Sequence, residues 1–340
     1  MGKMLVFFLH GVATKNADYA KPLQKLLRNE FNRRKQPLPH FYAGFWGNVF
    51  KQTGQMWNWI HHDLQALKAS NPQADTHDVF RYQEMREDFI SQFFGDALTY
   101  FNPERGFDIR DTIADQLYKF LKHHSQETEL HIVSHSLGTV ILWDALFSDR
   151  FADDDPAYTI RSLIAPSTQS LPRKAQLKSI TTMGSPILFF NMMLDVTPKQ
   201  IRTFLARYNT ESFKWLNILH ASDIIAYPLQ SSLNTESIPN LFFRDRYIWA
   251  DTNIAEKTAR TFGQTHAAMA VGVSDAHGSY WQSRGTARFI ASNLVGDTNS
   301  IDALKIDPDT DTLAATDYVG NLLNLSGQFM SQKFKDFSST

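Results

Sequence analysis

The chain has 340 residues, of which 43% are hydrophobic and 20% are charged, so it can bury a large core and does not have the composition of a disordered chain. Its 34 basic and 35 acidic residues give a net charge of −1, which lacks the basic field that a nucleic-acid partner needs. There is no cysteine, so disulfides, thiolate nucleophiles and cysteine-ligated metals are excluded.

The apolar segments are too short for targeting or membrane insertion. The run from Met4 to Leu9 is shorter than the apolar region of a signal peptide, and no small-residue cleavage pattern follows it. No run of about 18 apolar residues occurs, so we expect no membrane-spanning segment. The expected location is cytoplasmic, and the oligomeric state is left unknown.

The first predicted elements are a strand, a helix and a second strand. The run 4–9 is apolar on both faces, which is typical of a buried parallel strand. A helix is predicted over 18–34 and a strand over 40–45. Residues 48–106 then interrupt this order: they are rich in Trp, Phe and Met, and we interpret them as a helical insertion whose clearest helix covers 78–100.

Strands and helices alternate again after the insertion. In chain order the pattern predicts a helix capped by Asp108, a strand at 130–133, a helix at 137–147, a loop-rich stretch at 149–178, a strand at 179–183, a helix at 198–208, strands at 214–220 and 244–250, and a closing helix at 280–294. This alternation predicts an α/β fold with a mostly parallel central sheet and helices on both faces. We place this domain at 1–295 and expect a polar tail over 296–340, with one weak amphipathic helix around 313–334.

The strongest functional signal lies between residues 130 and 141. An apolar strand runs into an apolar helix through Ser134-His135-Ser136-Leu137-Gly138, the strand–turn–helix setting of a nucleophile elbow. Such a turn projects the central hydroxyl, and its flanking residues must be small because strand and helix approach closely. Gly138 fits, and Ser134 replaces the usual glycine while remaining small. A serine-rich turn without chemistry is the alternative. The N–H of Leu137 starts the helix and can donate to an oxyanion.

His10-Gly11 after a first strand, the elbow at Ser136 and a later histidine together resemble the α/β-hydrolase superfamily, and within it lipase- and esterase-like serine hydrolases. The resemblance covers roughly residues 4–295 without the insertions. It implies a catalytic serine, acid and histidine in that chain order. It also places the second oxyanion donor in the loop after the first strand, where we nominate the N–H of Val12 because Gly11 allows a close backbone approach. His10 is interpreted as a structural residue that hydrogen-bonds this turn.

Three histidines follow the elbow: His220, His266 and His277. His220 lies inside or at the end of a predicted strand, before any suitable acid. His277 lies after the last strand and just before the closing helix, where the resemblance places the catalytic base. His266, in the same connection, is the rival, and helix capping is the alternative role of His277.

The expected acid is Asp223, which follows the penultimate strand. Asp245 and Asp251, on either side of the last strand, are its rivals, and an Asx turn is its alternative role. Ser185 follows the strand after the elbow and is interpreted as a turn residue that lines the site. His10, Gly11 and His135 are also expected to line the site.

Metal and cofactor sites are not expected. The adjacent histidine pairs at 61–62 and 123–124 point to different helix faces, so neither makes a ligand set. The acidic run 153–155 is interpreted as a solvated loop.

These residues predict a serine hydrolase that cleaves a carboxylic ester through an acyl-enzyme, with a small-molecule or lipid-like acyl substrate. Ser136 would attack, His277 would take the proton, and Asp223 would stabilise the imidazolium. The aromatic insertion would form an apolar acyl site if it overhangs Ser136, and would otherwise only pack on the sheet edge. Thioester, amide or lactone cleavage by the same triad, a non-catalytic binding protein, and a membrane-surface role for the tail remain alternatives.

Overall fold

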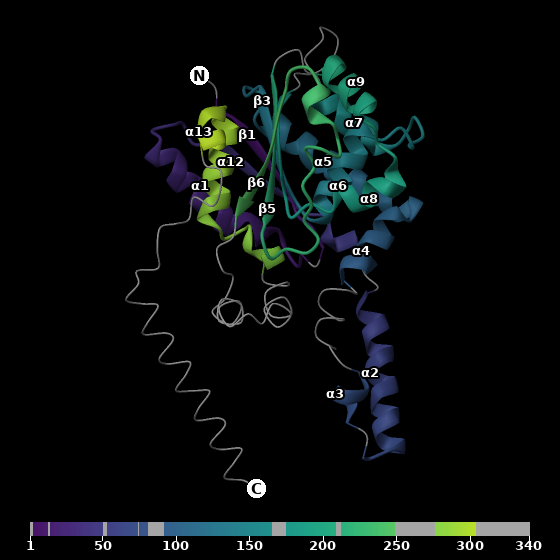
Figure 1. Cartoon of the computed structure of the whole chain (residues 1–340). Coiled ribbons are helices and arrows are strands. Elements are labelled where there is room, and N and C mark those ends of the chain that lie inside the picture. The colour runs from purple at the N-terminus through teal and green to yellow at the C-terminus, as the bar shows by residue number, and fades with distance from the viewer. Residues whose placement is uncertain are drawn as a thin grey trace, which may run out of the picture.

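A central sheet lies between two layers of helices in the computed structural model (Figure 1). The structure describes residues 3–12, 14–49, 53–73, 75–80, 92–164, 175–208, 212–248 and 276–303. Six parallel strands form the sheet in the order β2-β1-β3-β4-β5-β6. They are β1 (Leu5–Leu9), β2 (His40–Gly44), β3 (Glu129–His135), β4 (Gln176–Met183), β5 (Phe213–His220) and β6 (Leu241–Ile248). The predicted α/β class with a parallel sheet is confirmed.

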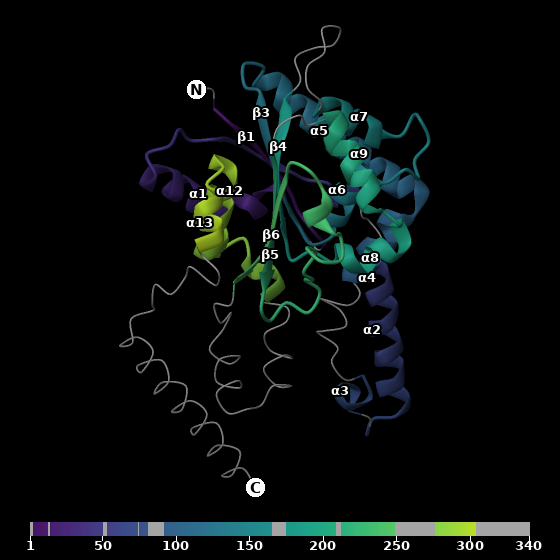
Figure 2. The ribbon, with the colours of Figure 1, turned by 45° about the horizontal axis from the view of Figure 1, so that its top comes forward.

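The two helical layers belong to different parts of the chain (Figure 2). One layer holds α1 (Lys21–Arg33), α12 (Arg284–Val295) and α13 (Thr298–Ala303). The other holds α5 (Pro103–His123), α6 (Leu137–Phe147), α7 (Pro156–Leu163), α8 (Ile187–Leu194) and α9 (Pro198–Tyr208). Turns of 3₁₀ helix cover Ala17–Ala20, Gly47–Val49 and Thr235–Ser237.

The residues of β1 show why the strands are apolar on both faces. Side chains alternate along a strand, so Val6 and Phe8 pack in the cluster with α1 and α12, while Leu5, Phe7 and Leu9 pack in the cluster with α5 and α6. All five are almost completely buried. A strand covered by helices on both sides therefore needs a continuous apolar run.

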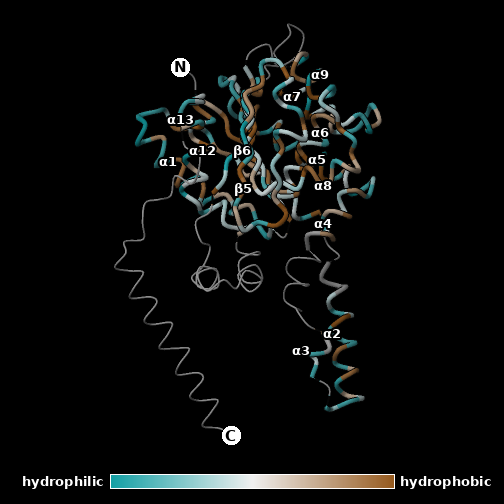
Figure 3. Tube along the Cα trace, viewed as in Figure 1, coloured by the Kyte–Doolittle hydropathy of each residue, from teal (hydrophilic) through white to brown (hydrophobic). Residues whose placement is uncertain are grey.

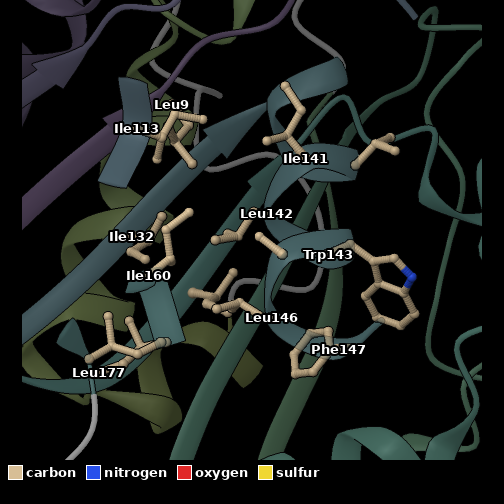
Figure 4. Packing of buried hydrophobic residues seen from close by; sticks show 14 of the residues in the cluster. Leu9, Ile113, Ile132, Ile141, Leu142, Trp143, Leu146, Phe147, Ile160 and Leu177 are labelled. Atoms are coloured by element: carbon tan, nitrogen blue, oxygen red, sulfur yellow. The ribbon is translucent and has the colours of Figure 1, made fainter. Parts of the chain in front are cut away.

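The helix α6 occupies the centre of the second layer. Every one of its residues is buried, which suits a helix that is hydrophobic on all sides. Figure 4 shows Ile141, Leu142 and Leu146 of α6 facing Ile132 of β3 and Ile160 of α7. Hydrophobic stretches follow the strands and the helices packed on them in Figure 3. The helix after Ser136 is thus fixed in the core, and its first turn is held rigidly.

The insertion contributes α2 (Thr53–Ser70), α3 (Thr76–Val79) and α4 (Gln92–Phe101). The helix α4 packs against α5 and α6, whereas α2 and α3 extend away from the sheet in both views (Figures 1 and 2). The long helix predicted over 78–100 falls partly on 81–91, which lie outside the described residues. On either side of that gap the chain is helical in α3 and α4.

Several predicted elements differ from the structure: β4 starts at Gln176, β6 covers Leu241–Ile248 and the closing helix α12 starts at Arg284. The helix expected to start at Asp108 begins at Pro103, because the Asn102 side chain accepts a hydrogen bond from the Arg105 N–H and caps it. The stretch 149–178 contains α7, capped by Asp155. Asp155 is also not a solvated loop residue, because it is buried in a two-bond ion pair with Arg110. The helix α8 was not predicted.

The packed body continues beyond residue 295. In α13, Ile301 is fully buried, and Asp302 pairs with both Arg244 and Arg246 of β6. The helix predicted around 313–334 lies outside the described residues. In the part of the chain that the structure describes, no helix is both long and apolar enough to cross a membrane.

The strand order places the point where the chain connections diverge between β1 and β3. β1 and β3 are neighbours, yet the chain leaves β1 towards β2 on one side and leaves β3 towards β4 on the other. Parallel sheets bind ligands where the connections diverge in this way, at the carboxyl ends of the strands. Gly11 follows β1 and Ser136 follows β3, so both lie at this point.

Candidate active site

Ser136 occupies the sharp turn between β3 and α6. Its backbone has φ 54° and ψ −130°, a conformation that is strained for a residue with a side chain. Gly138 makes this turn possible, because a Cβ there would lie 2.3 Å from the carbonyl oxygen of His10. The side chain of Ser134 is fully buried. Gly138 therefore lies where α6 approaches the end of β1 closely.

The structure brings Ser136, His277 and Asp223 together in one hydrogen-bonded chain. Ser136 Oγ is 2.7 Å from His277 Nε2, and His277 Nδ1 is 2.9 Å from Asp223 Oδ2. All three side chains are buried. In the tautomer that satisfies both contacts, Nδ1–H donates to the carboxylate and Nε2 accepts the serine proton. This arrangement makes the hydroxyl a potential nucleophile with a base in place.

Asp223 is ionised although it is buried. Burial acts to raise the pKa of this carboxyl. The charge and hydrogen bond of His277, together with bonds from the Tyr280 hydroxyl and the Ile225 N–H, outweigh burial and hold the pKa below its ordinary value. A permanent negative charge beside Nδ1 is what stabilises an imidazolium during proton transfer.

The rival acid Asp245 has a different role. Its carboxylate accepts hydrogen bonds from the Asn217 side chain and from the N–H groups of Leu229 and Gln230. It thereby fixes the loop after β5. The other rivals, Asp251 and His266, lie outside the described residues.

His220, the other described histidine after the elbow, is bound to its own turn. Its Nδ1 accepts from the Ser222 N–H, and its backbone N–H donates to the Tyr280 hydroxyl.

His10 holds the turn after β1, in keeping with the structural role expected for it. Its Nε2 accepts from the Trp46 N–H at 3.1 Å, so the protonated Nδ1 donates to the Gly11 carbonyl at 2.7 Å. Burial lowers the pKa of His10 to about 4, although the backbone hydrogen bond partly opposes this. The ring therefore stays neutral and stacks on Trp46.

Two backbone N–H groups border the nucleophile. Leu137 is the first residue of α6, and Val12 follows Gly11, which lies directly against the Ser136 side chain. Neither N–H donates to any part of the chain that the structure describes. Donors at a helix start and in a tight turn are suited to a developing oxyanion.

His135 connects the elbow to the base. Its Nε2 lies 2.7 Å from the His277 carbonyl oxygen, and the two rings are 4.7 Å apart. Burial lowers the pKa of His135 to about 3, so its neutral Nε2–H is the donor. His135 thus supports the main chain of the base.

Ser185 lies in a turn, as interpreted from the sequence. Its Oγ is 2.9 Å from Thr139 Oγ1 and accepts from the Ile187 N–H at the start of α8. No group of three metal-ligating side chains occurs among the described residues.

Tyr280 was missed as a site residue because it was predicted only to start the closing helix. Its hydroxyl donates to Asp223 Oδ2 at 2.8 Å and accepts from the His220 N–H. Its position three residues after His277, which places two side chains on one face of a helical turn, could have indicated this.

Comparison with known proteins adds little. No family model and no curated protein matches the chain. Among solved structures it is similar to the lin2722 gene product of Listeria innocua, with 12% identity and a TM-score of 0.35 over 86% of this chain and 94% of that chain. A likeness of this size shows neither a shared fold nor a shared activity.

Proposed function

We propose that the chain is a lipase- or esterase-like serine hydrolase of the α/β-hydrolase superfamily, which cleaves a carboxylic ester. The observation that carries this proposal is the contact of 2.7 Å between Ser136 Oγ and His277 Nε2, continued at 2.9 Å to Asp223. A buried serine, base and acid in this order are the parts that acyl transfer requires.

The proposed reaction has two halves. Ser136 Oγ attacks the ester carbonyl while its proton passes to His277 Nε2, and Asp223 stabilises the imidazolium. The N–H groups of Leu137 and Val12 donate to the oxyanion. The C–O bond to the alcohol then breaks, and His277 returns the proton to the leaving oxygen. Water attacks the acyl-enzyme by the same route and releases the acid, which restores Ser136.

Support for this assignment comes from the groups around the triad. The neutral ring of His10 holds the Gly11 turn, and the buried α6 fixes the Leu137 end. Donors preset in this way need no reorganisation when charge develops. We further propose a small-molecule or lipid-like acyl substrate and a cytoplasmic location.

The test is turnover of p-nitrophenyl esters of increasing acyl length by the wild type and by Ser136→Ala. We expect hydrolysis by the wild type and loss of about 10⁴-fold or more in the variant, at unchanged stability. Turnover retained by Ser136→Ala would overturn the proposal. Thioesters, amides and lactones offered in competition define the acyl chemistry, and a sharp preference for acetate would contradict a lipid-like substrate.

A further inference from the structure

The acid of the triad has a second hydrogen-bond donor besides the base. The Tyr280 hydroxyl and His277 Nδ1 contact the same oxygen, Asp223 Oδ2, at 2.8 and 2.9 Å. The other oxygen, Oδ1, accepts from the Ile225 N–H at 3.2 Å. Three donors from two segments of the chain therefore hold this carboxylate.

The Tyr280 side chain is itself fixed. It is fully buried, and its hydroxyl oxygen accepts the His220 N–H at 2.7 Å. Since that N–H occupies the oxygen, the phenolic hydrogen is directed to Asp223. A Cβ on Gly184 would lie 2.9 Å from both the Tyr280 ring and Asp223 Oδ2, so the pair is also closely enclosed.

We propose that Tyr280 is a positioning residue of the reaction, which orients the Asp223 carboxylate towards His277. The proposal rests on the proposed hydrolase function. Tyr280 does not touch the reacting atoms; it acts through Asp223 by sharing Oδ2 with the base. Its hydroxyl fixes the carboxylate oxygen that accepts from Nδ1 and takes up part of its negative charge.

Other titratable groups packed near this assembly stay constant in the test. The ring of His135 lies 4.7 Å from that of His277 and is neutral, because burial lowers its pKa to about 3. The ring of His220 lies 6.3 Å from that of Tyr280. Ser136 completes the set on the far side of His277. None of these ring and side-chain contacts involves the Tyr280 hydroxyl. Among these residues, His220 alone contacts that hydroxyl, through its backbone N–H.

The first experiment is the pH profile of kcat/KM for p-nitrophenyl ester hydrolysis by Tyr280→Phe. We expect the plateau to fall about tenfold through kcat with KM unchanged, the effect of losing one hydrogen bond to a charged group. The acidic limb moves to higher pH, because Oδ2 then attracts the imidazolium proton alone. On an Asp223→Asn background the same substitution has no further effect on the rate.

Tyr100→Phe is the matched control. Tyr100 is equally buried and donates to another aspartate, Asp144 Oδ2, at 2.6 Å. Among the described residues, Tyr100 makes no hydrogen bond to Ser136, His277 or Asp223. A purely structural role of Tyr280 predicts the same behaviour for both variants: lower stability with the wild-type rate and pH profile. That result would overturn the proposal.

A second variant covers the case in which Tyr280→Phe does not fold. Replacement of Tyr280 by 3-fluorotyrosine keeps the shape of the side chain and makes the hydroxyl a stronger donor. The acidic limb should then move to lower pH, opposite to the Phe variant, and an unmoved limb would overturn the proposal. Wild-type turnover that survives Ser136→Ala would instead overturn the hydrolase function, and the assignment of Tyr280 with it.

Discussion

Gly11 lies directly against Ser136. A Cβ built on Gly11 would be 2.3 Å from Ser136 Cβ and 2.8 Å from Ser136 Oγ. The loop after β1 and the turn after β3 therefore meet at the nucleophile without room for another atom. This contact joins the two strands at which the chain connections diverge.

Gly11→Ala should reduce ester hydrolysis by about 100-fold or more, because the new methyl group displaces either the hydroxyl or the Val12 N–H beside it. Initial rates with a short p-nitrophenyl ester measure this. Gly278→Ala is the control, since a Cβ there meets none of the described atoms beyond its own stretch of chain within 4 Å, although it adjoins His277. Equal activity of the two variants would contradict the close approach.

Asp223→Asn should lower kcat by about 10⁴-fold, because an amide cannot fix the His277 tautomer or stabilise the imidazolium. Asp245→Asn should reduce the free energy of unfolding while leaving the rate near wild type, since among the described residues the Asp245 carboxylate binds Asn217 and the Leu229–Gln230 backbone. Steady-state kinetics and urea denaturation of both variants separate the two roles. A larger rate loss in Asp245→Asn would reverse the assignment.

The protein should lose stability in mild acid. Burial lowers the pKa of His10 to about 4 and those of His131 and His135 to about 3. The unfolded chain binds these protons below about pH 6.5, whereas the folded chain does not, so this stability is complete above pH 6.5 and falls as the pH decreases. At pH 5 the loss is about 2 kcal/mol for each histidine.

Urea denaturation between pH 7.5 and pH 5 tests this pH dependence. His131→Asn, which keeps a partner for Ser179 at a site distant from Ser136, should show a flatter decline than the wild type. A decline as steep as that of the wild type would show that His131 does not contribute.

Ile301→Ala should cost about 2–4 kcal/mol of unfolding free energy, because Ile301 is fully buried in the α1–α12 layer. Asn299→Ala, at an exposed position of the same helix, should change it by less than about 0.5 kcal/mol. Thermal or urea denaturation gives both values. Equal stability of the two variants would mean that α13 is not part of the packed body.

The strand–helix order was predictable because parallel strands and buried helices need long apolar runs. Local signals also placed Ser136 in a tight turn. The start of α5 was misplaced because Asn102 competes with Asp108 as a cap, and only the surrounding packing decides between them. The helix α8 was missed because all its residues except Asn191 are apolar, which gives no helical periodicity.

Contacts between distant segments explain what the sequence could not show about the site. The partners Tyr280 and Asp223 are 57 positions apart, and His135 and His277 are 142 apart. No local pattern encodes either pair, although the spacing of Tyr280 from His277 predicts that these two side chains share a face. The sequence placed both Asp223 and Asp245 near strand ends, whereas Asp245 lies inside β6. Only the hydrogen bonds of the folded chain distinguish the candidate acid from a residue that fixes a loop.

Covalent labelling with a fluorophosphonate, followed by peptide mapping of the modified residue, tests the central claim most directly. We expect a single adduct on Ser136, formed in the wild type and greatly slowed in His277→Ala, because the hydroxyl reacts only with its base in place. A wild-type protein that remains folded and is not modified, or one modified at another serine, would contradict it.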